Sequence, residues 1–354
     1  MPGRLKTYGY VNAKIRSRLS ELLSERDFSD MLKAPSADEA VQVLAESAYA
    51  EELAAYGVTG DVRAVEFALT MHEMHVLRDI VKDLPGKAGS FTETLLLRYE
   101  VDMLKNALRL WFERYIRGRN ISGGSSYLYS EQIVNDVPCD AVVDADSPAD
   151  VRDVLQGTPY AEIVDRHIAE IDTEGHLFPL EIDLDCFYFS RLVEKAESLP
   201  QMDREIALRV TGVEVDLLNI DRIVRFVSYY RKEERNRWDL FLPGGRIDGQ
   251  TLKRAYAQDE EEDALITLLA DKYGEYRSFA EQHKSNPFAR LQMVEDLLRR
   301  ILYDEVKRLL WGYPFTVGTV LAYIFLKRKE VRSVVRLLNA KQYGLSEERI
   351  RESL

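Results

Sequence analysis

The chain has 354 residues, of which 46% are hydrophobic and 31% are charged, a balance that is typical of a folded globular protein. Its formal net charge of −12 argues against general nucleic-acid binding, because neutralising phosphates requires a surplus of Lys and Arg. Only two cysteines, Cys139 and Cys186, and no apolar core near Met1 favour a cytoplasmic protein without disulfides or a signal peptide.

Helical periodicity begins near the N-terminus. Val11, Ile15 and Leu19 recur at helical spacing with charged residues between them, which predicts an amphipathic helix. Residues 178–184 behave differently, because apolar and acidic residues alternate there as in a strand. The internal repeats described below favour a helix for that segment as well, so we expect an all-α protein.

Two further helices are predicted near the C-terminus. Asn286 can cap a helix whose first position is Pro287, and Gly312 gives a plausible stop. The apolar stretch 315–326 has twelve residues, whereas a membrane span needs about 20. We therefore expect a buried helix there and no direct membrane span.

One sequence motif occurs three times. Aligning Tyr49, Tyr160 and Tyr273 places a leucine five residues upstream in every copy, at Leu44, Leu155 and Leu268. The steps between the tyrosines are 111 and 113 residues. A weaker echo pairs Glu66 and Leu69 with Glu181 and Leu184.

A second motif keeps the same period. It contains Glu100, Glu214 and Glu330, with steps of 114 and 116 residues. Two motifs that keep one order and one period predict three similar helical units. We expect these units at residues 1–120, 121–235 and 236–354, with glycine-bearing seams between them.

No set of residues predicts catalysis, a cofactor or a metal. His72 and His75 are three residues apart, whereas a helical zinc motif needs four, and Glu73 lies between them. The pair Gly123-Gly124 and the pair Gly244-Gly245 lack the Lys and Ser/Thr of a phosphate loop, so turns are expected. Acids two residues apart, such as Glu100 and Asp102, point to different faces of a helix and cannot share one site.

The chain resembles the C subunit of the archaeal and bacterial A/V-type ATPases, whose eukaryotic relative is the d subunit of the vacuolar ATPase. The resemblance is most specific from Asn286 onward: an Asn-Pro-Phe helix start, an apolar stretch with Tyr323, the Glu330 helix, and a final Gly344-Leu345 turn. The chain departs from the family where Ser333-Val334 replaces an Asn-Leu pair.

The resemblance implies an all-α, funnel-like protein of three similar units around a pseudo-threefold axis. It implies a non-catalytic rotor component that couples the central stalk to the membrane ring of proteolipids and transmits torque for ion transport. The expected location is the cytoplasmic face of the membrane, as a peripheral component of the complex. The alternative is an unrelated cytoplasmic helical scaffold.

Charge suggests where a partner would bind. From Ser285 to Leu354 the chain has 13 Lys and Arg against 8 Asp and Glu, in contrast to its acidic remainder. Arg332, Arg336 and Lys341 are therefore the candidate contacts for an acidic stalk partner. Arg332 also raises a question, because the first two copies have Asp102 and Asp216 two residues after the glutamate.

Overall fold

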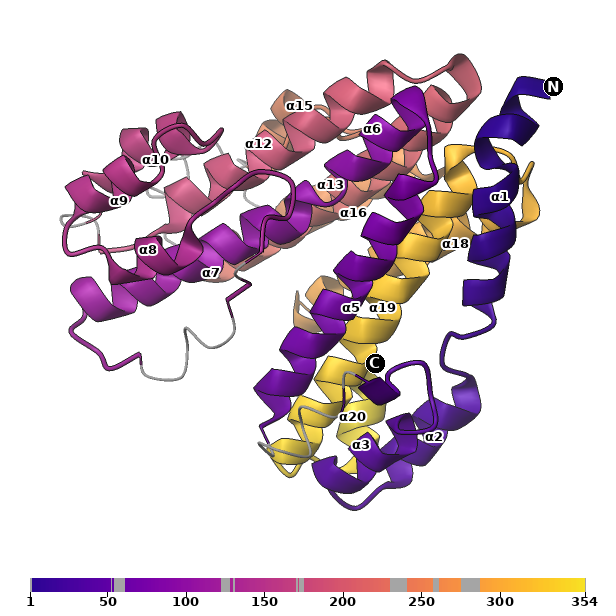
Figure 1. The fold of residues 1–354 in the computed structure, drawn as a ribbon, viewed down its shortest axis with the longest axis horizontal. Coiled ribbons are helices and arrows are strands. Elements are labelled where there is room, and N and C mark those ends of the chain that lie inside the picture. Colours follow the sequence, from indigo (N-terminus) through magenta and orange to yellow (C-terminus); the bar gives the residue numbers. More distant parts are fainter. Residues whose placement is uncertain are drawn as a thin grey trace.

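The computed structural model describes residues 2–51, 53, 61–121, 128–129, 131–169, 171, 175–229, 241–256, 261–274 and 287–353 (Figure 1). Within these ranges all regular structure is helical, which confirms the predicted all-α class. The long helices are α1 (Pro2–Leu19), α5 (Val62–Lys82), α7 (Leu97–Tyr115), α12 (Phe178–Glu197), α13 (Gln201–Tyr229), α18 (Pro287–Trp311) and α19 (Val317–Gln342). The shorter helices are α2 (Glu25–Lys33), α3 (Ala37–Leu44), α6 (Gly86–Thr94), α8 (Cys139–Asp144), α9 (Pro148–Val154), α10 (Ala161–Ile168), α15 (Gly249–Tyr256), α16 (Glu261–Lys272) and α20 (Glu347–Ser353).

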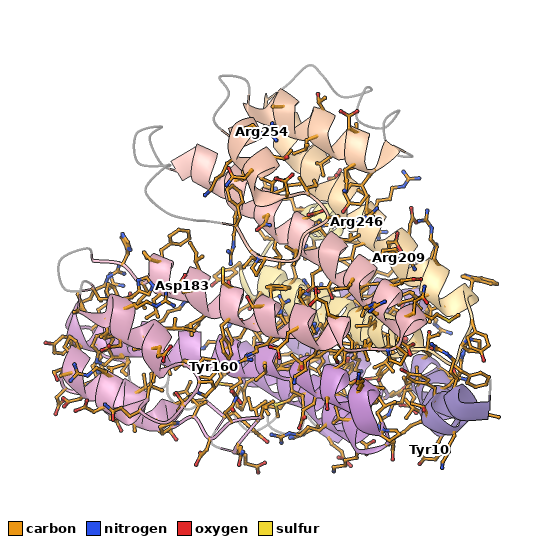
Figure 2. The ribbon with its side chains drawn as sticks, turned by 90° about the horizontal axis from the view of Figure 1, so that it is seen from above. Tyr10, Tyr160, Asp183, Arg209, Arg246 and Arg254 are labelled. Carbon is orange, nitrogen blue, oxygen red and sulfur yellow. The ribbon has the colours of Figure 1, made fainter. Side chains whose placement is uncertain are left out.

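The long helices diverge from the end of the molecule where α1 and the α12–α13 and α18–α19 connections lie (Figure 1). Helices α5 and α19 run side by side toward α2, α3 and α20, while α7 and α12 run toward α8, α9 and α10. The α15–α16 pair packs beside α18 and lies apart from both groups in the second view (Figure 2). Buried Asp203 joins the common end, since it accepts hydrogen bonds from Arg4 Nη1 at 3.2 Å and from the Val317 N–H at 3.1 Å.

The hydrophobic core consists of one extended cluster and two smaller ones. The extended cluster takes residues from α1, α5, α7, α12 and the first half of α19. The second lies among α13, α15, α16 and α18, and the third among α2, α3, α5, α20 and the second half of α19. Each group of short helices therefore packs on the long helices beside it.

Helix α12 explains the alternating pattern at residues 178–184. Leu180 and Leu184 are one helical turn apart and face the extended cluster, whereas Ile182 faces the second cluster. A helix buried on two sides can show apolar residues at every second position, so the strand-like period came from two buried faces. The repeat-based expectation of a helix is confirmed.

Helices α18 and α19 form largely as expected. Helix α18 begins at Pro287 and ends at Trp311, directly before Gly312, while Asn286 lies outside the described residues. Within the apolar stretch, residues 317–326 form the first turns of α19, Thr316 caps the helix, and residues 317–324 are buried. Among the described residues, no helix combines the length and apolar character that crossing a membrane requires.

Candidate functional site

Glu100 is the centre of a buried cluster on α7. Its side chain is only 2% exposed. It accepts hydrogen bonds from the backbone N–H groups of Val134 and Asn135 at 2.8 and 2.7 Å, and from Asn135 Nδ2 at 2.7 Å. The fourth donor is the Tyr160 hydroxyl at 2.6 Å. Burial and the neighbouring carboxylate raise the pKa of Tyr160 above its ordinary value, so the hydroxyl keeps the proton it donates.

Asp216 is the centre of a second cluster, on α13. It accepts hydrogen bonds from the Ile247 N–H at 3.0 Å and from the Tyr273 hydroxyl at 2.7 Å. Burial raises the pKa of Asp216 to about 6. Gly245 permits this approach, because a Cβ there would lie 2.5 Å from Asp216 Oδ1. Gly244 thus lies in a turn and Gly245 follows it beside the buried acid, whereas Gly123-Gly124 lies outside the described residues.

Glu330 is the centre of a third cluster, on α19, which joins distant parts of the chain. It accepts hydrogen bonds from the Tyr49 hydroxyl and from the Leu23 N–H, which lie 281 and 307 positions away in sequence. Lys327 Nζ lies 3.2 Å from Glu330 Oε1 and 4.1 Å from the centroid of the Tyr49 ring. Lys327 is itself buried, so this cluster contains a complete ion pair removed from water.

The three clusters correct the alignment of the second motif. The counterpart of Glu100 and Glu330 is Asp216, two residues beyond the expected Glu214. Burial supports this register, because fully buried apolar residues follow each acid at positions four and seven: Leu104 and Ala107, Ile220 and Ile223, Val334 and Leu337. The tyrosine alignment is confirmed, since Tyr49, Tyr160 and Tyr273 each donate to one of these acids.

The corrected register also answers the question about Arg332. Arg98, Glu214 and Arg328 occupy equivalent positions, two residues before the acids, and Asp102, Leu218 and Arg332 follow two residues after them. Glu214 binds Arg98 Nη1 at 2.8 Å and so ties α13 to α7. Arg332 is therefore the counterpart of Asp102 and Leu218, and Asp216 has a different, buried role.

Two hollows lie beside these helices and share Arg98 and Asp102 in their linings. The hollow among α7, α12 and α13 has a volume of 680 Å³. Ion pairs connect its walls, with Lys105 Nζ 2.7 Å from Asp185 Oδ1 and Arg109 Nε 2.6 Å from Glu181 Oε1. Both ion pairs connect α7 to α12.

The second hollow, among α5, α7 and α19, has a volume of 610 Å³ and contains the predicted contact Arg332. Arg328 also lines it, with Nε 3.1 Å from Glu73 Oε1. Its Nη2 is buried and has no hydrogen-bond partner among the described residues. Burial and the nearby charges of Arg98 and Arg328 lower the pKa of Arg332 from its ordinary value.

The other two predicted contacts lie elsewhere on α19. Arg336 is exposed and does not line this hollow. Lys341 Nζ donates to the backbone oxygens of Leu32, at 2.9 Å, and Ala34, so it holds the C-terminal end of α2. The structure thus brings together Arg332 with Arg98 and Arg328, and it does not bring Arg336 and Lys341 to the same hollow.

The residues weighed as metal ligands have other contacts. Glu73 accepts from the Tyr99 hydroxyl at 2.5 Å and pairs with Arg328. The His72 ring lies edge-on to Tyr49, with centroids 5.3 Å apart, and His75 Nε2 lies 3.4 Å from the Tyr129 hydroxyl. Among the described residues, no three His, Cys, Asp or Glu side chains gather in a metal-binding arrangement.

Among the buried charges that sequence reasoning missed are Lys327 and Asp203. Lysine and aspartate are usually exposed to solvent, and a lysine in the charged run 327–329 gives no sign of burial in the sequence. A signal for Asp216 was present, since the residues four and seven positions after it are isoleucines. After Glu214 the seventh position is polar Asp221.

Comparisons with known proteins agree on one family. The family model described as ATP synthase (C/AC39) subunit matches residues 11–353. The C subunit of the A-type ATP synthase of Pyrococcus abyssi is 24% identical over 346 residues, covering 98% of this chain and 89% of the relative. The corresponding protein of Thermococcus gammatolerans is 26% identical over 350 residues, with the same coverage of 98% and 89%. That of Methanocaldococcus jannaschii is 23% identical over 354 residues, covering 99% and 86%.

Proposed function

The chain belongs to the ATP synthase (C/AC39) subunit family, and on that premise we propose that it couples the central stalk to the membrane proteolipid ring of an A-type ATP synthase. The observation that carries the proposal is the match over residues 11–353, nearly the whole chain. As the C subunit of a rotary ATP synthase, it is a component without catalytic sites. The same match excludes an unrelated helical scaffold.

The architecture suits a part that transmits torque. Close-packed helices resist deformation. The three buried acid clusters add hydrogen bonds between the long helices and the loops and short helices beside them. Ion pairs between α7, α12 and α13 add further cross-links. Stiffness and two partner surfaces are what the role requires, and it needs no nucleophile or general base.

The proposal includes a funnel of three similar units around a pseudo-threefold axis, at residues 1–120, 121–235 and 236–354. The recurrence of one cluster chemistry at Glu100, Asp216 and Glu330 supports it. In this division each cluster joins one unit to the next, since each acid and its tyrosine come from different units. The third cluster would connect the last unit back to the first.

In the complex, the stalk proteins would bind one face of the funnel and the proteolipid ring the other. The chain would lie at the cytoplasmic face of the membrane as a peripheral component. The exposed aromatic side chains Trp311 and Tyr313, beside the α18–α19 connection, are available for one of these contacts.

Depletion of the chain from the reconstituted ATP synthase tests the function. We expect ATP hydrolysis by the catalytic part to continue while ATP-driven ion pumping into vesicles is lost, and we expect pumping to return when the chain is added back. Coupled pumping that persists at the original rate without the chain would contradict the proposal.

A further inference from the structure

The hollow among α5, α7 and α19 contains a positive charge without a carboxylate partner. Arg98 and Arg328 each have one, Glu214 at 2.8 Å and Glu73 at 3.1 Å. Arg332 has no ion-pair partner among the described residues, and its Nε donates only to the Arg328 backbone oxygen at 3.3 Å. It is exposed to water within the hollow.

The position of Arg332 makes this charge unfavourable in the free chain. Burial lowers the pKa of Arg332 and the charges of Arg98 and Arg328 lower it further, while the carboxylates of Glu214 and Glu73 offset part of this effect. The buried Nη2 of Arg328 lacks a hydrogen-bond partner among the described residues beside it. A carboxylate that entered the hollow would relieve the repulsion, because a guanidinium can bind one through two parallel hydrogen bonds.

The rest of the lining indicates what carries that carboxylate. Phe67, Met71 and Met103 provide apolar surface on the walls opposite α19. Methionine adapts its shape to apolar partners and is common on surfaces that receive amphipathic helices. A free anion would use only the arginine, whereas a helix with an acidic residue beside apolar ones would use both surfaces.

We propose that this hollow receives an acidic, amphipathic helix of a central-stalk protein, with a carboxylate of that helix paired to Arg332. The inference rests on the proposed function and adds the binding site and its chemistry. It also gives the three basic residues predicted from sequence different roles. Arg332 lies at the docking site, Lys341 binds the end of α2, and Arg336 lies outside the hollow.

The test measures binding of the purified central-stalk proteins of the same ATP synthase to the full chain by calorimetry. Arg332→Glu should weaken binding by at least about 30-fold, because it places like charges in a desolvated contact. Arg332→Lys should weaken it by only several-fold, since charge remains without the paired donors. Arg336→Glu is the matched control on the same helix and should leave affinity within about twofold. Thermal unfolding of each variant checks that the fold is retained.

The outcomes distinguish this inference from the proposed function. If the wild-type chain does not bind the stalk proteins, the proposed function itself fails. If the wild type binds and Arg332→Glu binds equally well, or if Arg336→Glu weakens binding as much, only the docking site is wrong. Loss of inorganic phosphate binding or of self-association in Arg332→Glu, with stalk affinity unchanged, would assign the hollow to a small anion or to a second copy and overturn the proposal.

Discussion

Glu100 and Glu330 are both buried carboxylates that accept a hydrogen bond from a buried tyrosine, but their other partners differ. Glu100 is held by neutral groups from residues 134, 135 and 160, all within 60 positions of it. Glu330 is held across 281 and 307 positions and also pairs with the buried ammonium of Lys327. The comparison teaches that a buried carboxylate bound by a tyrosine can occur with or without a buried cation, which changes the free energy lost when the carboxylate is neutralised.

The largest expected effect comes from neutralising the two acids. Glu330→Gln leaves the Lys327 ammonium buried without a counter-charge and should lower the free energy of unfolding by about 3–5 kcal/mol. Glu100→Gln leaves only neutral donors partly unpaired and should cost about 1–2 kcal/mol. Urea unfolding followed by circular dichroism measures both variants. Adding Lys327→Met to Glu330→Gln should recover part of the lost free energy of unfolding. Equal losses for Glu330→Gln and Glu100→Gln would contradict the comparison.

A smaller effect concerns the third acid, Asp216, whose pKa is raised to about 6 by burial. Asp216 therefore binds a proton more tightly in the folded state than in the unfolded chain, so its contribution to the free energy of unfolding falls as the pH rises from about 4 to about 6. The shift corresponds to about 2–3 kcal/mol. Asp216→Asn should remove this dependence, and its stability relative to the wild type should increase through that pH window.

Urea midpoints of the wild type and Asp216→Asn, measured between about pH 4 and pH 8, check this prediction. The conservative change keeps an oxygen that can accept from the Ile247 N–H. A difference between the two proteins that does not vary with pH would show that Asp216 does not titrate in the folded state as described.

The smallest effects are expected from removing single hydroxyls. Tyr49→Phe, Tyr160→Phe and Tyr273→Phe each delete one donor to a buried carboxylate and should cost about 1–2 kcal/mol. The loss should be largest for Tyr273, because Asp216 then retains one backbone donor, and smallest for Tyr160, because Glu100 retains three. Thermal unfolding midpoints of the three variants give the order, and the reverse order would contradict it.

Much of the fold could be predicted from the sequence, because helix starts, stops and periodicity are local. The Pro287 start, the Gly312 stop and the tyrosine alignment are examples. The register of the second motif was wrong because Glu100-Val101-Asp102 and Glu214-Val215-Asp216 are locally alike. Which acid faces the core depends on how α13 packs. The buried residues four and seven positions after Asp216 lie on the same face of the helix and indicate that packing.

The candidate site was less predictable than the fold. The positive charge of the C-terminal segment indicated Arg332, Arg336 and Lys341 together, since net charge carries no information on where side chains point. Lys341 instead bonds two backbone oxygens at the end of α2, a long-range contact that a sequence pattern does not encode. Pairing of Arg98 and Arg328 with acids from other helices likewise depends on tertiary packing.

The Glu330 cluster has a consequence for how the protein is made. During synthesis, Tyr49 leaves the ribosome 281 residues before its carboxylate partner, a delay of roughly 15–60 seconds at about 5–20 residues per second. The Glu100 and Asp216 clusters draw on segments at most 60 positions apart and can close earlier. The hydrogen bonds of Leu23 and Tyr49 with Glu330 therefore form only after α19 emerges. Among the three clusters, that of Glu330 is therefore the last that can form.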